Sequence, residues 1–153
     1  QFVDMLLSHV PQTLTFGVFG KMEFAVVEAT EITADGRVYL STSVGASPTF
    51  LHEAEKIIIE INRFHSPRVS EMSDIVMLAP PPNREPIPIV DAMTRAGFPY
   101  VPVDPKKIVG IVEHSEPDDV APFDPPNKSH NMIAQYVLGL GKPNYSPPAK
   151  KAG

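Results

Sequence analysis

The sequence has 153 residues, which is enough for one ordinary domain with its own core. Its formal net charge is −5 and its 13 lysines and arginines are scattered, so the composition gives no support for nucleic-acid binding. It contains no cysteine, which excludes a disulfide scaffold and a cysteine-rich zinc site, and no apolar run approaches the ~20 residues of a membrane span.

The first twenty residues predict a strand-like piece, a helical turn around Pro11 and a loop rich in phenylalanine and glycine. The chain opens with Gln1 instead of a methionine and enters structured-looking sequence at once. We therefore expect a fragment, or a processed or truncated form of a longer protein.

The central stretch predicts the unit to which the other elements attach. Apolar residues on both sides of the Ala-Asp-Gly turn at 34–36 predict a β-hairpin closed by an Asp-Gly pair. A turn over 43–46 leads to Ser47, an expected helix N-cap, and to Pro48 at the first helical position. The helix must be short, because the β-branched run at 56–61 is typical of a strand covered on both faces. This succession predicts an α/β sheet.

Beyond residue 62 the signals are weaker. Residues 75–78 form a second apolar stretch, and the prolines between residues 80 and 88 require an extended segment. Residues 91–97 predict one or two helical turns that end at a C-cap glycine.

The last elements are two strands, expected at 100–103 and 108–112, and one helix. Apolar side chains recur at helical spacing over 128–140, which predicts that helix. Residues 141–153 have the composition of a disordered tail or linker.

Common catalytic signatures are missing. No two of the five histidines have the i, i+4 spacing of an H-E-x-x-H motif, so that motif is excluded and we expect no metal ligands. The segment around Ser47 resembles half of a nucleophile elbow, but Thr49 stands where the second glycine belongs. Glycine-rich phosphate loops are absent as well.

The turn before the short helix is the best candidate for ligand contact. The backbone N–H groups of Gly45, Ala46 and Ser47 lie between strand and helix, where unpaired amides favour an anion. If 38–41 joins the sheet, the turn lies at a carboxyl end, where ligands of open α/β sheets collect. An ordinary capped turn with nothing bound explains these residues equally well.

Four charged residues are further candidates. Glu28 and Glu60 are carboxylates inside apolar strand patterns, and each must find a partner or be protonated. Ion pairing with Arg37 or Arg63 is the better explanation for them. Arg84 and Arg95 offer forked donors for a carboxylate or phosphate, although solvated surface positions explain them better.

The sequence resembles the acetyl-CoA hydrolase/transferase family, which includes succinyl-CoA:acetate and propionyl-CoA:succinate CoA-transferases. The order, spacing and chemical type of four blocks carry the resemblance, at 2–10, 19–50, 54–76 and 100–113. It implies a half-domain of the CoA-transferase superfamily, with a mixed, largely parallel sheet flanked by helices. Residues 1–140 would then be part of the N-terminal CoA-transferase domain.

The resemblance also implies a chemistry. Family members use a glutamate nucleophile that becomes a glutamyl-CoA thioester, and this glutamate and a glycine-rich CoA-binding motif lie in the second half, which has no counterpart here. We therefore expect no catalytic residue in this chain, no cofactor, and coenzyme A as a substrate. The substrate-binding residues expected from the resemblance form the turn Ser43, Val44, Gly45, Ala46 and Ser47.

The expected partners are acyl-CoA, small carboxylates such as acetate or succinate, and a second half of the enzyme or a complementary subunit. The whole protein is expected to be a cytoplasmic homodimer, with the mitochondrial matrix as the alternative compartment, and to bind neither nucleic acid nor membrane. A competing hypothesis is a non-catalytic ligand-binding or partner subunit with the same superfamily fold.

Overall fold

The computed structural model describes residues 3–120 and 122–140. The chain divides into two units, Gln1–Pro117 and Asp118–Gly153. The second unit contains the helix α3 (Lys128–Leu140), which has the predicted bounds. The tail expected at 141–153 lies outside the described residues.

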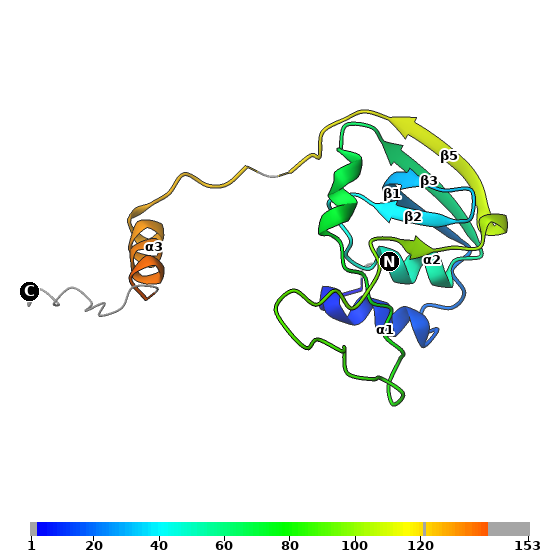
Figure 1. The fold of residues 1–153 in the computed structure, drawn as a ribbon, viewed down its shortest axis with the longest axis horizontal. Helices are drawn as coiled ribbons and strands as arrows, with labels where there is room; N and C mark the ends of the chain where they lie inside the picture. Colours follow the sequence, from blue (N-terminus) through cyan, green and yellow to red (C-terminus); the bar gives the residue numbers. More distant parts are fainter. Residues whose placement is uncertain (1–2, 121, 141–153) are drawn as a thin grey trace, which may run out of the picture. The chain divides into compact units, whose positions relative to one another are not determined.

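A five-stranded mixed sheet forms the centre of the first unit (Figure 1). Its strand order is β4-β2-β1-β3-β5. The pairs β1/β3 and β3/β5 are parallel, whereas β1/β2 and β2/β4 are antiparallel. The α/β prediction with a mixed sheet is therefore confirmed. The bounds of the strands are β1 Phe24–Ile32, β2 Arg37–Leu40, β3 Lys56–Asn62, β4 Val101–Pro102 and β5 Ile108–His114.

The predicted hairpin joins β1 and β2. Gly36 adopts a φ of 85°, a left-handed conformation that glycine reaches without steric cost. A Cβ at this position would lie 2.0 Å from the carbonyl oxygen of Val103, so the turn also requires a glycine for close approach. The backbone N–H of Val103 donates to the Gly36 carbonyl at 2.8 Å, which ties the hairpin to the end of β4.

Short helices surround the sheet: η1 (Leu7–His9), α1 (Val10–Thr15), α2 (Ser47–Glu53), η2 (Pro67–Met72) and η3 (Pro105–Lys107). The prediction of a strand-like piece before Pro11 is wrong, because the described residues there form η1, which continues into α1. Pro11 fits the first turn of a helix, where its missing N–H is not needed.

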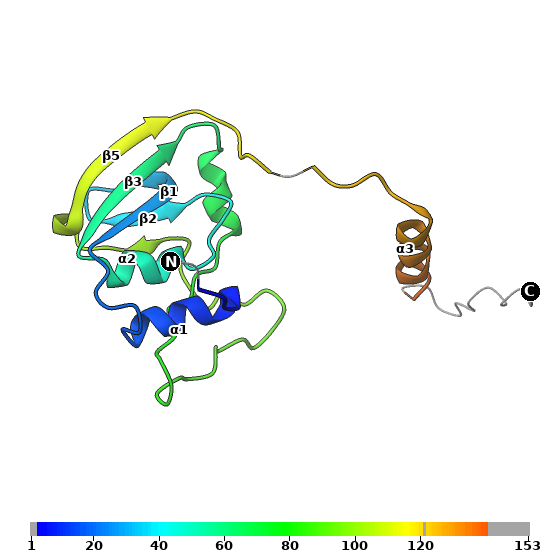
Figure 2. The same ribbon diagram turned by 180° about the vertical axis from the view of Figure 1, so that it is seen from behind.

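One face of the sheet carries the core. Figure 2 shows α2 between this face and α1. The buried side chains come from alternate positions of the strands and from α2, and they include Ala25, Val27, Ala29, Ile57, Ile59, Ile61 and Leu51. On the opposite face Phe24 and Val26 are exposed and Ile58 is half-buried. The expectation that 56–61 is covered on both faces is therefore not met among the described residues.

The segment between η2 and β4 contains no regular helix or strand, so the prediction of helical turns at 91–97 is wrong. The backbone N–H groups of Ala96 and Gly97 donate to the Asp74 carboxylate, at 3.2 and 2.7 Å, instead of to nearby carbonyls. Arg95 donates to the carbonyls of Glu71 and Ser73. These distant contacts override the local helix signal.

Two smaller differences concern the last part of the first unit. The strand expected at 100–103 is reduced to two residues, since Pro102 has no N–H to donate. Arg84 donates to the carbonyl of Ala79, so its guanidinium also has a local partner.

No helix of the described residues is long and apolar enough to cross a membrane.

Candidate functional site

The turn Ser43–Ser47 connects β2 to α2. Leu40 at the end of β2 pairs with Ala29, and Ala29 pairs with Ile61 near the carboxyl end of β3. The turn therefore starts beside the carboxyl end of a parallel strand, the region where open α/β sheets bind ligands. Gly45 has a φ of 45°, which reverses the chain into the helix.

The helix begins one residue earlier than expected. Ala46 is the N-cap, Ser47 is the first helical residue and Pro48 is the second, so the assignment of Ser47 as the N-cap is wrong. The backbone N–H of Ser47 donates to the Val44 carbonyl at 3.0 Å, which folds Ser47 into the turn. An N-cap residue has non-helical angles and accepts with its side chain, and no side chain caps this helix.

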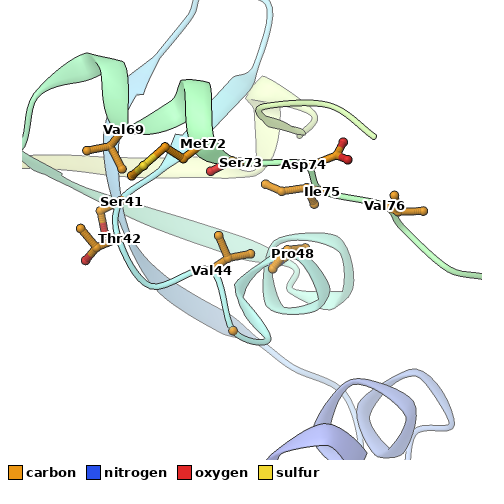
Figure 3. Close-up of a pocket in the computed structure, with 11 residues that line it drawn as sticks. Ser41, Thr42, Val44, Pro48, Val69, Met72, Ser73, Asp74, Ile75 and Val76 are labelled. Carbon is orange, nitrogen blue, oxygen red and sulfur yellow. The ribbon is translucent and has the colours of Figure 1, made fainter. Parts of the chain in front are cut away.

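A pocket of about 460 Å³ lies between this turn and the segment after β3 (Figure 3). Of the five residues predicted for substrate binding, Val44 and Gly45 line the pocket. Ser43, Ala46 and Ser47 are not among its lining residues. The other lining residues are Ser41, Thr42, Pro48, Val69, Met72, Ser73, Asp74, Ile75 and Val76.

A second group of polar side chains lies on the strands β1, β3 and β5. Glu28 and Glu60 are neighbours in the parallel register of β1 and β3. Because side chains alternate along a strand, both carboxylates project from the face opposite the buried Val27 and Ile59. Both are intermediate in exposure.

Asn62 anchors this group at the end of β3. Its side chain is buried, and Nδ2 donates to Glu28 Oε2 at 3.1 Å and to the Glu116 carbonyl at 2.8 Å. Its Oδ1 accepts from the backbone N–H of Phe64 at 3.0 Å. Both donors and the acceptor of the amide are therefore used, which fixes the position of the Glu28 carboxylate.

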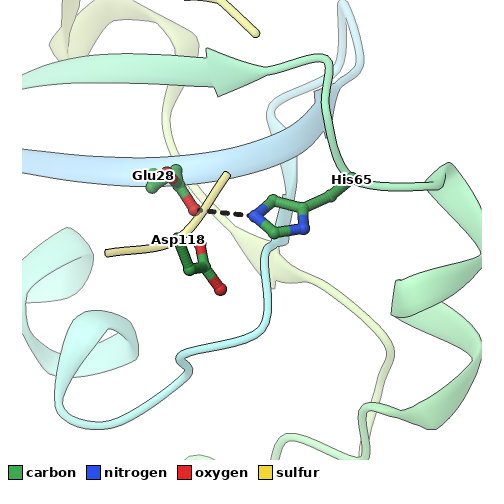
Figure 4. A group of neighbouring side chains, drawn as sticks. All are labelled: Glu28, His65 and Asp118. Atoms are coloured by element: carbon green, nitrogen blue, oxygen red, sulfur yellow. Dashed lines mark ion pairs between the residues drawn. The ribbon is translucent and has the colours of Figure 1, made fainter. Parts of the chain in front are cut away.

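Two histidines complete the group. Figure 4 shows His65, from the loop after β3, facing Glu28; its Nε2 lies 3.8 Å from Glu28 Oε1. Nε2 of His114, at the end of β5, lies 3.8 Å from Glu28 Oε2 and 3.3 Å from Glu60 Oε1. Asp118, also drawn in Figure 4, belongs to the second unit.

The arginines predicted to pair with the two glutamates have other partners. Arg37 pairs with Asp35 at 3.0 Å, and Arg63 pairs with Glu113 at 2.6 Å. The Arg63 hydrogen bond lowers the pKa of the Glu113 carboxyl. The prediction failed because Arg63 lies in the turn after β3, where its guanidinium reaches Glu113 on β5 instead of Glu28 on β1.

The i, i+4 spacing of a helical motif detects neither His65 nor His114, because the two histidines come from different parts of the chain. A usable signal was present, since His65 and His114 each follow or end an apolar strand run. The carboxyl ends of parallel strands meet at one edge of a sheet, so side chains there come together.

Comparison with known proteins places these features in a family context. Residues 1–113 match the acetyl-CoA hydrolase/transferase N-terminal domain family. The chain is 45% identical to a propanoyl-CoA:succinate CoA transferase of Escherichia coli over 90% of this chain and 28% of that protein. An acetyl-CoA hydrolase of Eremothecium gossypii is 39% identical over 90% of this chain and 28% of its own length. A succinyl-CoA:acetate CoA-transferase of Clostridium kluyveri is 37% identical over 92% and 26%. The chain thus spans little more than a quarter of these relatives.

Proposed function

This chain belongs to the acetyl-CoA hydrolase/transferase family, whose N-terminal domain it matches, and we propose that it forms part of an acyl-CoA:carboxylate CoA-transferase or acetyl-CoA hydrolase. The observation that carries the proposal is similarity along nine tenths of the chain to enzymes named for both activities. The proposed substrates are an acyl-CoA and a small carboxylate such as acetate or succinate.

The proposed reaction proceeds through covalent intermediates on a glutamate that lies outside this chain. The glutamate carboxylate attacks the thioester carbonyl and the C–S bond breaks. This step expels CoA thiolate and forms an acyl-glutamyl anhydride. The thiolate then attacks the glutamyl carbonyl, which releases the donor acid and forms a glutamyl-CoA thioester. Splitting one difficult transfer into such steps conserves the thioester energy.

The second half of the cycle runs in reverse with the acceptor. The acceptor carboxylate attacks the glutamyl-CoA thioester and expels the thiolate, which then attacks the acceptor carbonyl of the new anhydride. The products are a new acyl-CoA and the free glutamate. Attack by water on the thioester would give hydrolysis instead. Coenzyme A acts as a substrate throughout, and no resident cofactor is required.

Within this scheme we assign the turn Ser43–Ser47 a place close to the substrate. Support comes from the pocket that Val44 and Gly45 line, and from the position of the turn beside the carboxyl end of β3. Because α2 has only seven residues, its dipole contributes nothing to the assignment. The pocket mixes apolar walls with hydroxyl groups, which suits a short acyl or thioester segment better than a highly charged phosphate.

The test uses the whole protein that contains this chain. Incubation with acetyl-CoA and succinate should yield succinyl-CoA, whereas incubation without an acceptor should release free CoA at the rate of hydrolysis. Intact mass spectrometry after incubation with acyl-CoA should reveal a covalent CoA adduct. A whole protein that consumes no thioester and forms no adduct would contradict the proposal and favour a non-catalytic binding subunit. Size-exclusion chromatography of the same material checks the expected homodimer.

A further inference from the structure

The sheet face opposite the core is apolar, and a large part of it is uncovered among the described residues. We name it the outer sheet face. Its apolar side chains are Phe24 and Val26 on β1, Ile58 on β3 and Val112 on β5. Phe24, Val26 and Val112 are 52%, 63% and 55% exposed. We propose that an amphipathic helix of the whole protein, from a segment outside these 153 residues, packs on this face.

The direction of the strands predicts a cover on this face. The strands β1, β3 and β5 are adjacent and all parallel. Parallel strands occur almost only where helices cover both faces, because the chain must cross over the sheet between them. Since side chains alternate along a strand, Ile58 faces away from the buried Ile57 and Ile59. A strand with one face in water commonly carries a polar residue at such a position.

The apolar residues of the outer sheet face form one continuous patch. Val26 pairs with Ile58, and Ile58 pairs with Gly110, so this row across the three strands contains no polar side chain. Val112 lies one row further along β5. Because Gly110 has no side chain, a bulky apolar residue of a helix can approach the backbone of β5 there. Contiguous exposed apolar patches of this kind mark interaction surfaces.

Charged residues at the two ends of the outer sheet face favour one direction for the helix. Lys56 lies at the amino end of β3, with its Nζ atom 5.2 Å from the centre of the Phe24 ring. Glu28 and Glu60 lie beyond the apolar row, towards the carboxyl ends of their strands. A helix has a positive amino end and a negative carboxyl end, so it fits these charges when it runs antiparallel to the strands. This is also the direction of a helix that crosses over between parallel strands.

The length of the relatives indicates where the helix comes from. The chain covers 26 to 28% of the three relatives described above, so more than two thirds of each lies outside the match. A segment of the same polypeptide meets the outer sheet face at a high effective concentration, whereas a separate partner loses translational freedom on binding. The helix is therefore assigned to the same polypeptide. This proposal rests on the exposed face and on the partial match, and it does not depend on the proposed activity.

The experiment measures thiol labelling in the whole protein that contains this chain. These 153 residues contain no cysteine, so Val26→Cys adds a single one to them, and mass spectrometry of its peptide reports the labelling rate. The rate should be at least a hundredfold lower in the native protein than in urea, because the helix shields position 26. The control is Val90→Cys, since Val90 is 85% exposed in the proline-rich segment, and its rate should change less than tenfold.

A photo-crosslinking residue then identifies what covers the face. p-Benzoylphenylalanine in place of Val112 should give a product of monomer mass on a denaturing gel, joined to a peptide outside the 153 residues. A crosslinked dimer would assign the face to a second copy and overturn the proposal. A crosslink to a peptide within the 153 residues would overturn it as well.

The labelling experiment can also contradict the proposal by itself. Labelling of Val26→Cys that is as fast in the native protein as in urea would show that nothing covers the face. If circular dichroism shows that Val26→Cys does not fold, Val112→Cys on the edge strand β5 provides the same measurement. Neither readout uses thioester consumption, so an inactive protein with a shielded face would contradict only the proposed function.

Discussion

A hydrogen bond of 3.1 Å joins Asn62, the last residue of β3, to Glu28 in the middle of the neighbouring parallel strand β1. The same amide donates to the carbonyl of Glu116, so one buried side chain links β1, β3 and the segment that follows β5. These two hydrogen bonds, called the Asn62 lock below, hold the carboxyl edge of the sheet together beside the apolar core. This contact decides where the Glu28 carboxylate points.

We predict that Asn62→Ala destabilises the chain by about 2 to 4 kcal/mol, because it removes a bond to a charged group and leaves the Phe64 N–H without its acceptor. Urea unfolding followed by circular dichroism measures the loss. Asn83→Ala in the exposed proline-rich segment is the control and should change stability by less than about 0.5 kcal/mol. Equal losses of unfolding free energy in the two variants would show that the Asn62 lock does not stabilise the chain.

The core is closed over the central strands and open at the edge strand β5, and two isoleucines in register test this. Ile59 on β3 is fully buried, whereas its partner Ile111 on β5 is about half exposed. Ile59→Ala should cost about 2 to 5 kcal/mol, since it removes buried methyl groups and leaves a cavity. Ile111→Ala should cost much less in the same unfolding experiment. Similar costs would mean that the second position is covered as well.

The hairpin turn should make stability depend on pH in acid. The hydrogen bond from the Thr33 hydroxyl, and then the charge of Arg37, lower the pKa of Asp35 below 3.8. A lowered folded-state pKa means that this stabilisation is present above the unfolded pKa and is lost as the pH falls through the folded value. Asp35→Asn should therefore flatten the melting-temperature profile below about pH 4.

The comparison for this prediction is Thr33→Val, which removes the hydroxyl that donates to Asp35 at 2.5 Å. It should reduce the same acid-dependent part of the profile while keeping the carboxyl. If Asp35→Asn and the unsubstituted chain lose melting temperature in parallel through this range, the turn does not carry the effect.

The proposed substrate turn can be tested at Gly45. Asparagine tolerates a positive φ better than most residues, so Gly45→Asn adds a side chain at the pocket with little backbone strain. In the whole enzyme it should raise KM for the acyl-CoA about tenfold with a smaller effect on kcat. Gly20→Asn, also at a positive φ with open space around it, is the control. Equal KM values for the two variants would remove the turn from the site.

Much of the fold follows from local chemistry in the sequence. The Asp35-Gly36 pair determines the hairpin because only a few residues accept its backbone angles. The β-branched run of β3 and the helical spacing of α3 each favour one backbone conformation before any contact is made. The family could be predicted as well, since order and spacing of whole blocks are properties of the chain itself.

Other features depend on residues that are far apart in the chain. No helix forms at 91–97, because the Asp74 carboxylate accepts the hydrogen bond from the Gly97 N–H. Ser47 is not the N-cap, because its own N–H donates to the Val44 carbonyl within the turn. Strand register brought Glu28 to Asn62, His65 and His114 instead of to an arginine. The sequence by itself determined the β1–β2 hairpin, the strand β3, the helix α3 and the family, because propensities and turn angles act over a few neighbouring residues. Only the tertiary structure decided the partners of the half-buried Glu28 carboxylate, because a partner is set by which strands lie side by side and in what register.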